Sequence, residues 1–253
     1  VAGSNAALSL LGKEPLVLGR HEAYLGVLID DLVTVGTQEP YRMFTSRAEH
    51  RLVLREDNVY RRLSAMGHRI GLLPQARYEA MLDFERQVDT EMVRIETRKC
   101  DPNPQRQALL ATKKSQPVKK GTTWAQLLKR PELNEEDLVE LEAADDLVAN
   151  AEQPLSPLER RIRYRAAVEV KYAGYVLRAQ KMIEKDKAME KALLPSAIFE
   201  KQLPGMSNEV FEKLAEVQPR TLAQAARISG MTAAAISLLA VELRRYEQSS
   251  QAV

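Results

Sequence analysis

Apolar residues recur at helical spacing along much of the chain, most clearly in two long stretches. In the first, successive apolar positions are three or four residues apart, which is typical of the buried face of an amphipathic helix. These positions are Met81, Phe84, Val88, Met92 and Ile95. Pro74 precedes them and suits the first turn of a helix, because a proline there loses no intrahelical hydrogen bond. The pattern predicts a packed helix from Pro74 to about Arg98.

The second long stretch begins with the strongest helix start signal in the chain. Ser156, Pro157 and Glu159 combine an N-cap residue, a proline at the first helical position and the glutamate of a capping box. The helix is predicted to reach about Leu193, which is roughly 55 Å at 1.5 Å per residue. Its packing face consists of Ile162, Ala166, Val170, Ala173, Leu177 and Ile183.

Shorter helices are predicted over residues 1–12, residues 22–33 (as a helix or a turn-rich stretch) and wherever a capping residue precedes apolar positions. Such capping residues are Asn58, Thr123, Asn134, Ser207, Thr221 and Thr232. The helix after Asn58 is expected to reach about Met66, where Gly67 and Gly71 break it. The helix after Asn134 is expected to reach about Asn150. Residues 101–121 contain three prolines and four lysines, so they are expected to form a linker or a mobile loop.

These patterns predict a mainly α fold. We expect an elongated helical domain that carries one long helix, followed by a small C-terminal unit like a helix-turn-helix. The expected parts are residues 1–72, 73–194 and 195–253.

Composition narrows the possible functions. The 253 residues carry a net charge of only +2, so anion binding must come from local patches. Cys100 is the only cysteine and cannot form an internal disulfide, which fits a reducing, cytoplasmic setting. No stretch approaches the ~18 apolar residues of a membrane helix, and no signal peptide is expected. No glycine-rich nucleotide motif, metal-ligand spacing or nucleophile–base pair stands out, so no catalytic or metal-binding residue is assigned.

Residues 39–58 concentrate positive charge and aromatic rings. The arginines are Arg42, Arg47, Arg51 and Arg55. Ser46 and Glu49 match a capping box, which predicts a short helix on which the last three arginines share one face. The arginine fork suits phosphate and aromatic rings can stack on bases, so the pattern is compatible with nucleic-acid binding. The alternative is a solvated or salt-bridged surface, which is what most charge runs form.

Arginines also crowd the first turns of the long helix. Arg160, Arg161 and Arg163 lie where they oppose the helix dipole, which suggests an anionic partner. Arginine side chains that cover apolar surface would explain the pattern nearly as well.

The C-terminal unit has the spacing of a helix-turn-helix at Ala226, Gly230 and Ile236. The helix that would enter a DNA groove, residues 232–243, is mainly alanine and leucine, whereas a groove-binding helix needs polar side chains early. An apolar face of this kind better suits a protein partner.

Several segments resemble, in the same chain order, signature segments of one protein family. They are residues 23–33 (AYLGVLIDDLV), 39–58 (EPYRMFTSRAEHRLVLREDN), 170–175 (VKYAGY), 193–195 (LLP) and 224–232 (QAARISGMT). They resemble the glucose-inhibited division protein A family, also called MnmG, whose members are flavin-dependent enzymes that modify the wobble uridine of tRNA. The resemblance touches nearly the whole chain, is loose over about residues 79–153, and implies a C-terminal fragment.

The resemblance implies that FAD, NADH and a methylenetetrahydrofolate donor serve the full-length enzyme, a homodimer. With the GTPase MnmE it adds a carboxymethylaminomethyl or aminomethyl group to C5 of the uridine. Residues 1–72 would end the FAD-binding domain, with Gly3 and Asn5 at FAD, whereas the fragment alone is expected to bind no cofactor and to be inactive. The expected tRNA-binding residues are Arg42, Arg47, Arg51, Arg55, Arg160, Arg161 and Arg163. The expected MnmE-docking residues are Ile228, Met231, Ile236, Leu239 and Leu243.

Two alternatives remain open. In one, the chain is a non-enzymatic DNA-binding module that uses the C-terminal helix-turn-helix. In the other, it is a scaffold in which every arginine cluster is structural.

Overall fold

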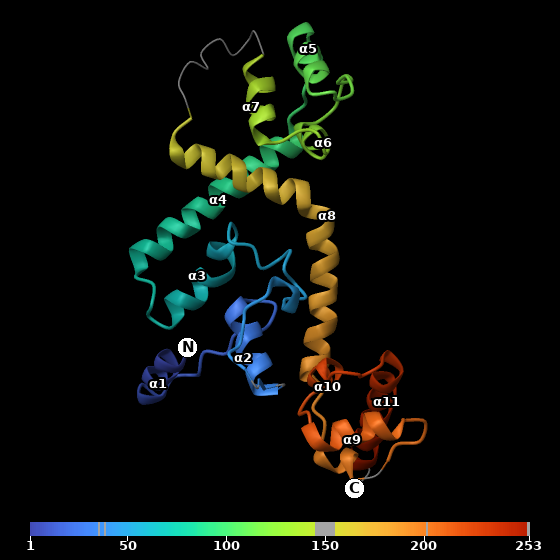
Figure 1. The fold of residues 1–253 in the computed structure, drawn as a ribbon. Coiled ribbons are helices and arrows are strands. Elements are labelled where there is room, and N and C mark those ends of the chain that lie inside the picture. Colours follow the sequence, from blue (N-terminus) through green and yellow to red (C-terminus); the bar gives the residue numbers. More distant parts are fainter. Residues whose placement is uncertain (35, 38, 145–154, 201, 252–253) are drawn as a thin grey trace. The chain divides into compact units, whose positions relative to one another are not determined.

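A computed structural model of the chain describes residues 1–34, 36–37, 39–144, 155–200 and 202–251. Within these ranges the chain is mainly α-helical, as predicted, and contains no β-strand beyond two isolated bridges (Figure 1). The α-helices are α1 (Ala2–Leu10), α2 (Tyr24–Thr34), α3 (Val59–Arg69), α4 (Gln75–Thr97), α5 (Pro104–Thr112), α6 (Trp124–Leu128), α7 (Glu135–Ala143), α8 (Pro157–Lys191), α9 (Asn208–Val217), α10 (Leu222–Arg227) and α11 (Ala233–Gln251). None of the described helices combines the length and apolar character that a membrane crossing requires.

The chain forms two compact units. Unit 1 comprises Val1–Leu16 and Leu54–Leu177, and unit 2 comprises Val17–Val53 and Arg178–Val253. These bounds differ from the three consecutive parts expected from the sequence, because residues 17–53 associate with the C-terminal residues. The Arg227–Asp30 ion pair and a 3.1 Å contact between His50 Nε2 and the Asp186 carboxylate join the two segments of unit 2.

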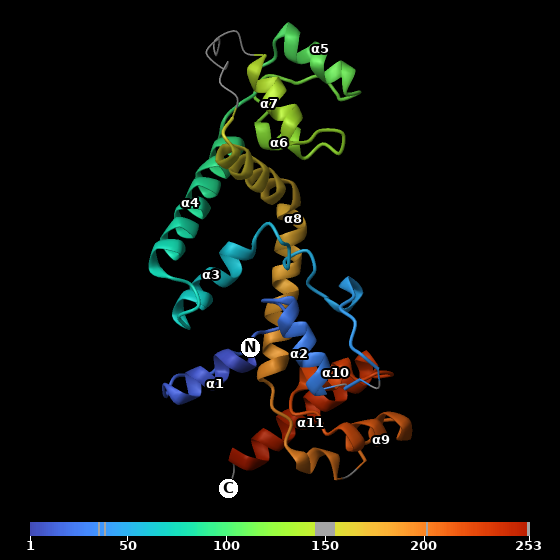
Figure 2. The same ribbon diagram turned by 60° about the vertical axis from the view of Figure 1, so that its left-hand side comes forward.

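Unit 1 is built on the two predicted long stretches. Val88 and Ile95 of α4 and Ala166 and Val170 of α8 are almost fully buried in one core. The remaining core comes from the short helices at the end of α4 and the start of α8 (Figure 2), including Leu110, Trp124, Leu127, Leu128, Leu138 and Leu141. The capping boxes at Thr123–Gln126 and Ser156–Glu159 form as predicted.

Several predictions in unit 1 are wrong. Asn58 precedes α3 without a side-chain capping bond, and Ala173 and Leu177, expected on the packing face of α8, are exposed. Residues 101–121 are not a structureless linker, because α5 forms where the Asn103 side chain caps the amide of Arg106 and Pro104 occupies the first turn. Because the prolines and lysines of this segment are typical of a loop, the helix start at Asn103 and Pro104 was not predicted. Gly67 does not end α3, which continues to Arg69 and stops before Gly71, a residue with φ +81°. The helix after Asn134 is predicted to reach about Asn150. Its predicted part after residue 144 lies outside the residues that the structure describes.

Unit 2 contains the C-terminal helices, whose caps Ser207, Thr221 and Thr232 form as predicted. Its core includes Leu214, Leu222, Ala225, Leu239 and Leu243. Helix α2 packs against the preceding loop so closely that a Cβ on Gly26 would lie 2.3 Å from the carbonyl oxygen of Gly19. Position 26 therefore tolerates only glycine without backbone movement.

Candidate nucleic-acid interface

The arginine-rich segment does not form the predicted helix. Only Thr45–Arg47 make a single 3₁₀ turn, and the residues up to Val53 follow as turns. The Glu49 carboxylate, expected to close a capping box, instead accepts a hydrogen bond from Arg20 Nε at 3.1 Å. A charged partner far along the chain therefore outcompetes the local cap, and Arg47, Arg51 and Arg55 do not share a helix face.

Arg20 holds the segment in place. Its side chain is 8% exposed and pairs with Asp30 at 3.0 Å and with Asp31 at 2.5 Å. Its Nη2 also donates to the carbonyl oxygen of Arg47 at 3.1 Å. Burial alone would lower the pKa of Arg20, but the bonds to Asp31 and Glu49 outweigh burial and raise it, so Arg20 stays charged.

Asp31 is the second anchor of unit 2. It accepts a hydrogen bond from the Tyr41 hydroxyl at 2.6 Å and lies 3.6 Å from Arg47. Burial opposes ionisation of Asp31, yet the bonds from Tyr41 and Arg20 hold its pKa below the ordinary 3.8. The Arg47 guanidinium also lies 4.7 Å from the centre of the Tyr41 ring. The Arg47 side chain is half-exposed and already has two local partners, the Asp31 carboxylate and the Tyr41 ring.

Arg42 and Arg51 differ from their neighbours. Both are exposed, and neither makes an ion pair or a side-chain hydrogen bond with any residue that the structure describes. Their segment is anchored through Arg20 and Asp31. Two guanidinium groups of this kind on a held backbone are suited to binding phosphate.

Arg55 belongs to unit 1 and is engaged by carboxylates. It pairs with Asp57 at 2.9 Å and with Glu169 at 3.0 Å, and its side chain is only 14% exposed. Arg165, 2% exposed, binds the same two residues. The network joins the start of α3 to α8, which gives Arg55 a structural role.

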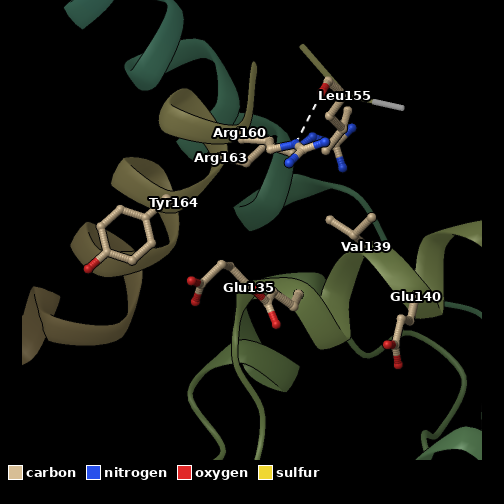
Figure 3. A pocket seen from close by; sticks show the side chains of 8 residues that line it. Glu135, Val139, Glu140, Leu155, Arg160, Arg163 and Tyr164 are labelled. Carbon is tan, nitrogen blue, oxygen red and sulfur yellow. Dashed lines mark hydrogen bonds between the residues drawn. The ribbon is translucent and has the colours of Figure 1, made fainter. Parts of the chain in front are cut away.

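The arginines at the start of α8 face an acidic helix. Glu135, Glu136 and Glu140 of α7 line one side of a cavity of about 580 Å³, and Arg160 and Arg163 line the other (Figure 3). Arg163 pairs with Glu142 at 2.8 Å, whereas Arg160 bonds only the carbonyl oxygen of Leu155 among the described residues. Glu142 and the carbonyl oxygen of Leu155 therefore offset much of the unfavourable interaction between these arginines and the helix dipole.

A further basic ridge was missed in the sequence. Arg178, Lys181 and Lys185 lie in the part of α8 that belongs to unit 2, and all three are exposed. Their spacing of three and four residues puts them on one helix face. This spacing is visible in the sequence and predicts a shared helix face for charged residues as it does for apolar ones.

The residues expected near FAD, Gly3 and Asn5, lie at the start of the chain. Both polar groups of the Asn5 side chain are occupied by the backbone of Leu16, at 3.0 and 2.6 Å. Gly3 is exposed, and a Cβ there would meet nothing within 4 Å, so no cradle requires a glycine. The described residues also contain no cluster of His, Cys, Asp and Glu that could hold a metal ion. The contact of Gly3 and Asn5 with FAD therefore stays a prediction.

The expected docking residues separate by burial. Leu239 and Leu243 are 0% and 6% exposed and lie in the core of unit 2, so the expectation that they contact a partner is corrected. Ile228, Met231 and Ile236 pack against this core and are partly exposed. The sequence prediction missed Ala234 and Val241, which are exposed on α11.

Two family models match the chain. Residues 75–180 match the C-terminal helical domain of the tRNA modifying enzyme MnmG/GidA. Residues 182–253 match the C-terminal helical bundle of the same enzyme. The boundary between the two matches lies within α8.

Curated relatives and solved structures agree with these matches. The tRNA uridine 5-carboxymethylaminomethyl modification enzymes MnmG of Geobacter metallireducens and Thermodesulfovibrio yellowstonii are 42% and 43% identical, over 96% and 97% of the chain. The chain spans 38% of the length of each. A crystal structure of Aquifex aeolicus GidA matches 96% of the chain and 36% of its own, with a TM-score of 0.68 and 35% identity. The chain therefore belongs to the MnmG/GidA family, and its residues 75–253 correspond to that family's C-terminal helical domain and helical bundle.

Proposed function

We propose that the chain is the tRNA-binding and partner-docking part of a cytoplasmic, FAD-dependent enzyme. With the GTPase MnmE, that enzyme adds a carboxymethylaminomethyl or aminomethyl group to C5 of the wobble uridine of tRNA. The relatives carry this modification in their names. The observation that carries the tRNA-binding part is the exposure of Arg42 and Arg51 without a partner among the described residues.

Arg42 and Arg51 would bind phosphates of the tRNA backbone. Their segment is held by the Arg20 network, so little backbone entropy is lost when a phosphate binds. The basic ridge of Arg178, Lys181 and Lys185 would add weaker contacts of the same kind. Arg55 is excluded from the proposed contacts, because Asp57 and Glu169 already neutralise it.

Flavin and nicotinamide chemistry is proposed for parts of the enzyme outside this chain. Asn5 is committed to the backbone of Leu16, and Gly3 lies in the open. The described residues would bind and orient the RNA and would take no part in hydride or one-carbon transfer.

Removing Arg42 and Arg51 together tests the RNA contact. We expect the double variant Arg42→Ala, Arg51→Ala to bind tRNA more weakly and to lower the slope of log affinity against log salt by roughly 0.7–0.9 for each lost phosphate contact. The matched control is Arg77→Ala with Arg86→Ala, which removes the same charge from exposed positions of α4. Fluorescence anisotropy across a salt series measures both. Equal slopes for the two double variants would contradict phosphate binding by Arg42 and Arg51.

The exposed side of α11 is the proposed docking surface for MnmE. Val241 is 46% exposed there and Ala234 is exposed one heptad earlier on the same face. We expect Val241→Asp to weaken MnmE binding by at least about tenfold, because an apolar contact would become a desolvated charge. Val93→Asp on α4, where the valine is 57% exposed, is the control in unit 1. Unchanged MnmE affinity of both variants, measured by calorimetry, would refute this surface.

A further inference from the structure

Unit 1 contains a second cavity, of about 340 Å³, that the proposed phosphate contacts do not use. It is lined by the loop before α3, the start of α3, helix α4 and the first turns of α8. The residues that line it are Glu56, Asp57, Tyr60, Phe84, Arg161, Tyr164 and Arg165. Its volume falls at the small end of the ~300–1,000 Å³ typical of small-molecule sites.

Aromatic rings and the Arg161 guanidinium make up much of the cavity wall. Tyr60 meets Phe84 edge to face, with ring centres 6.0 Å apart and planes at 84°. The Arg161 guanidinium lies 5.4 Å from the centre of the Phe84 ring, and Tyr164 is 49% exposed. Aromatic and guanidinium planes are the surfaces on which proteins stack unpaired nucleobases.

The polar groups of the cavity fall into two sets. Asp57 and Arg165 pair with each other, at 3.4 Å, and with the network around Glu169, although Arg165 Nη2 is buried without a hydrogen-bond partner among the described residues. By contrast, Glu56, Tyr60 and Tyr164 make no side-chain hydrogen bond or ion pair with any residue in the described part of the chain. The cavity therefore offers the Glu56 carboxylate as an acceptor, and two hydroxyls, beside its aromatic wall.

This combination favours the ring of a base over a phosphate. A carboxylate repels phosphate but accepts hydrogen bonds from the amino groups of cytosine, adenine and guanine. Uracil has no amino group and offers only its N3–H, which lies between two carbonyl oxygens that repel a carboxylate. The buried Arg165 donates to the carbonyl oxygen of Asp57 at 2.8 Å, which fixes the loop carrying Glu56 against α8.

We propose that this cavity binds one unstacked, amino-bearing nucleobase of a single-stranded stretch of RNA. The ring stacks against the wall that the aromatic side chains and Arg161 form together, and its amino group donates to Glu56. The proposal rests on the proposed tRNA binding and names an additional contact for it. A strand is favoured over a free nucleotide, because Arg160, exposed and without a carboxylate partner among the described residues, lies one helical turn before the cavity residue Tyr164 and can bind an adjoining phosphate.

Short RNA oligonucleotides of cytidine, adenosine or uridine test the proposal on the 253-residue chain. We expect the cytidine and adenosine oligomers to bind more tightly than the uridine oligomer. Glu56→Ala is expected to bring the three affinities within about twofold of one another, because it removes the acceptor. Tyr164→Ala is expected to weaken the amino-bearing oligomers by about 5- to 100-fold. Both residues are largely exposed, so both variants should fold, which circular dichroism checks.

The outcomes separate this inference from the proposed function. Salt-dependent binding of tRNA with no change in base preference in Glu56→Ala or Tyr164→Ala would overturn the nucleobase site and leave tRNA binding intact. Binding of AMP as tight as that of the adenosine oligomer would make the occupant a free nucleotide and would also overturn it. Absence of binding to tRNA and to every oligomer would overturn the proposed function and this inference together.

Discussion

Replacing Arg20 by methionine is expected to lower the free energy of unfolding of unit 2 by about 3–5 kcal/mol. The methionine fills much of the space but leaves Asp30, Asp31 and Glu49 without the cation that they surround. Asp31 is only 13% exposed, and without Arg20 its buried charge would keep only the Tyr41 hydroxyl and the more distant Arg47 as partners. Urea unfolding followed by far-ultraviolet circular dichroism measures the change.

The control for Arg20 is Arg51→Met, which removes an exposed arginine without an ion pair in the described ranges and should change stability by no more than about 0.5 kcal/mol. Adding Asp31→Asn to Arg20→Met should restore part of the loss, because one buried charge disappears with its partner. Equal stability of the Arg20 and Arg51 variants would mean that the network does not hold the arginine-rich segment.

Leu239→Ala is the second large expected effect, with a loss of about 2–5 kcal/mol in the stability of unit 2. Leu239 is 0% exposed at the centre of the C-terminal core, so its truncation leaves a cavity. Trp124, the only tryptophan, lies in the core of unit 1. Its fluorescence transition in urea should therefore shift less than the circular dichroism transition.

Val241→Ala, two positions further along α11, is the matched control and should change stability by no more than about 0.5 kcal/mol. Stability equal to the parent in Leu239→Ala, with weakened MnmE binding, would instead make Leu239 a partner contact, as the sequence alone predicts.

Helix starts were predictable, because each depends on residues three positions apart. The Thr123–Gln126 and Ser156–Glu159 caps form in the structure with the expected side chain-to-backbone bonds. The Ser46–Glu49 cap failed because Arg20, 29 residues before Glu49, binds the same carboxylate. Local sequence cannot show such a competitor, since it depends on the tertiary fold.

In the candidate site, too, the tertiary fold decides which charged residues are exposed. The sequence shows that Arg51 and Arg55 are charged, but only the fold separates the exposed Arg51 from Arg55, which is held by Asp57 and Glu169. In the same way, Leu239 and Val241 are both apolar residues of α11, yet one is core and the other surface. Tertiary burial and ion pairing decide which members of a predicted cluster remain available to a ligand.

The most direct test of tRNA binding is a salt titration of the unmodified chain, by fluorescence anisotropy, with a tRNA that has uridine at the wobble position. Duplex DNA of equal charge is measured beside it. The proposed function requires tighter binding to the tRNA, with affinity that falls steeply as salt rises. Equal affinity for both nucleic acids, or binding to neither, would contradict the proposal that this chain carries a tRNA-binding surface.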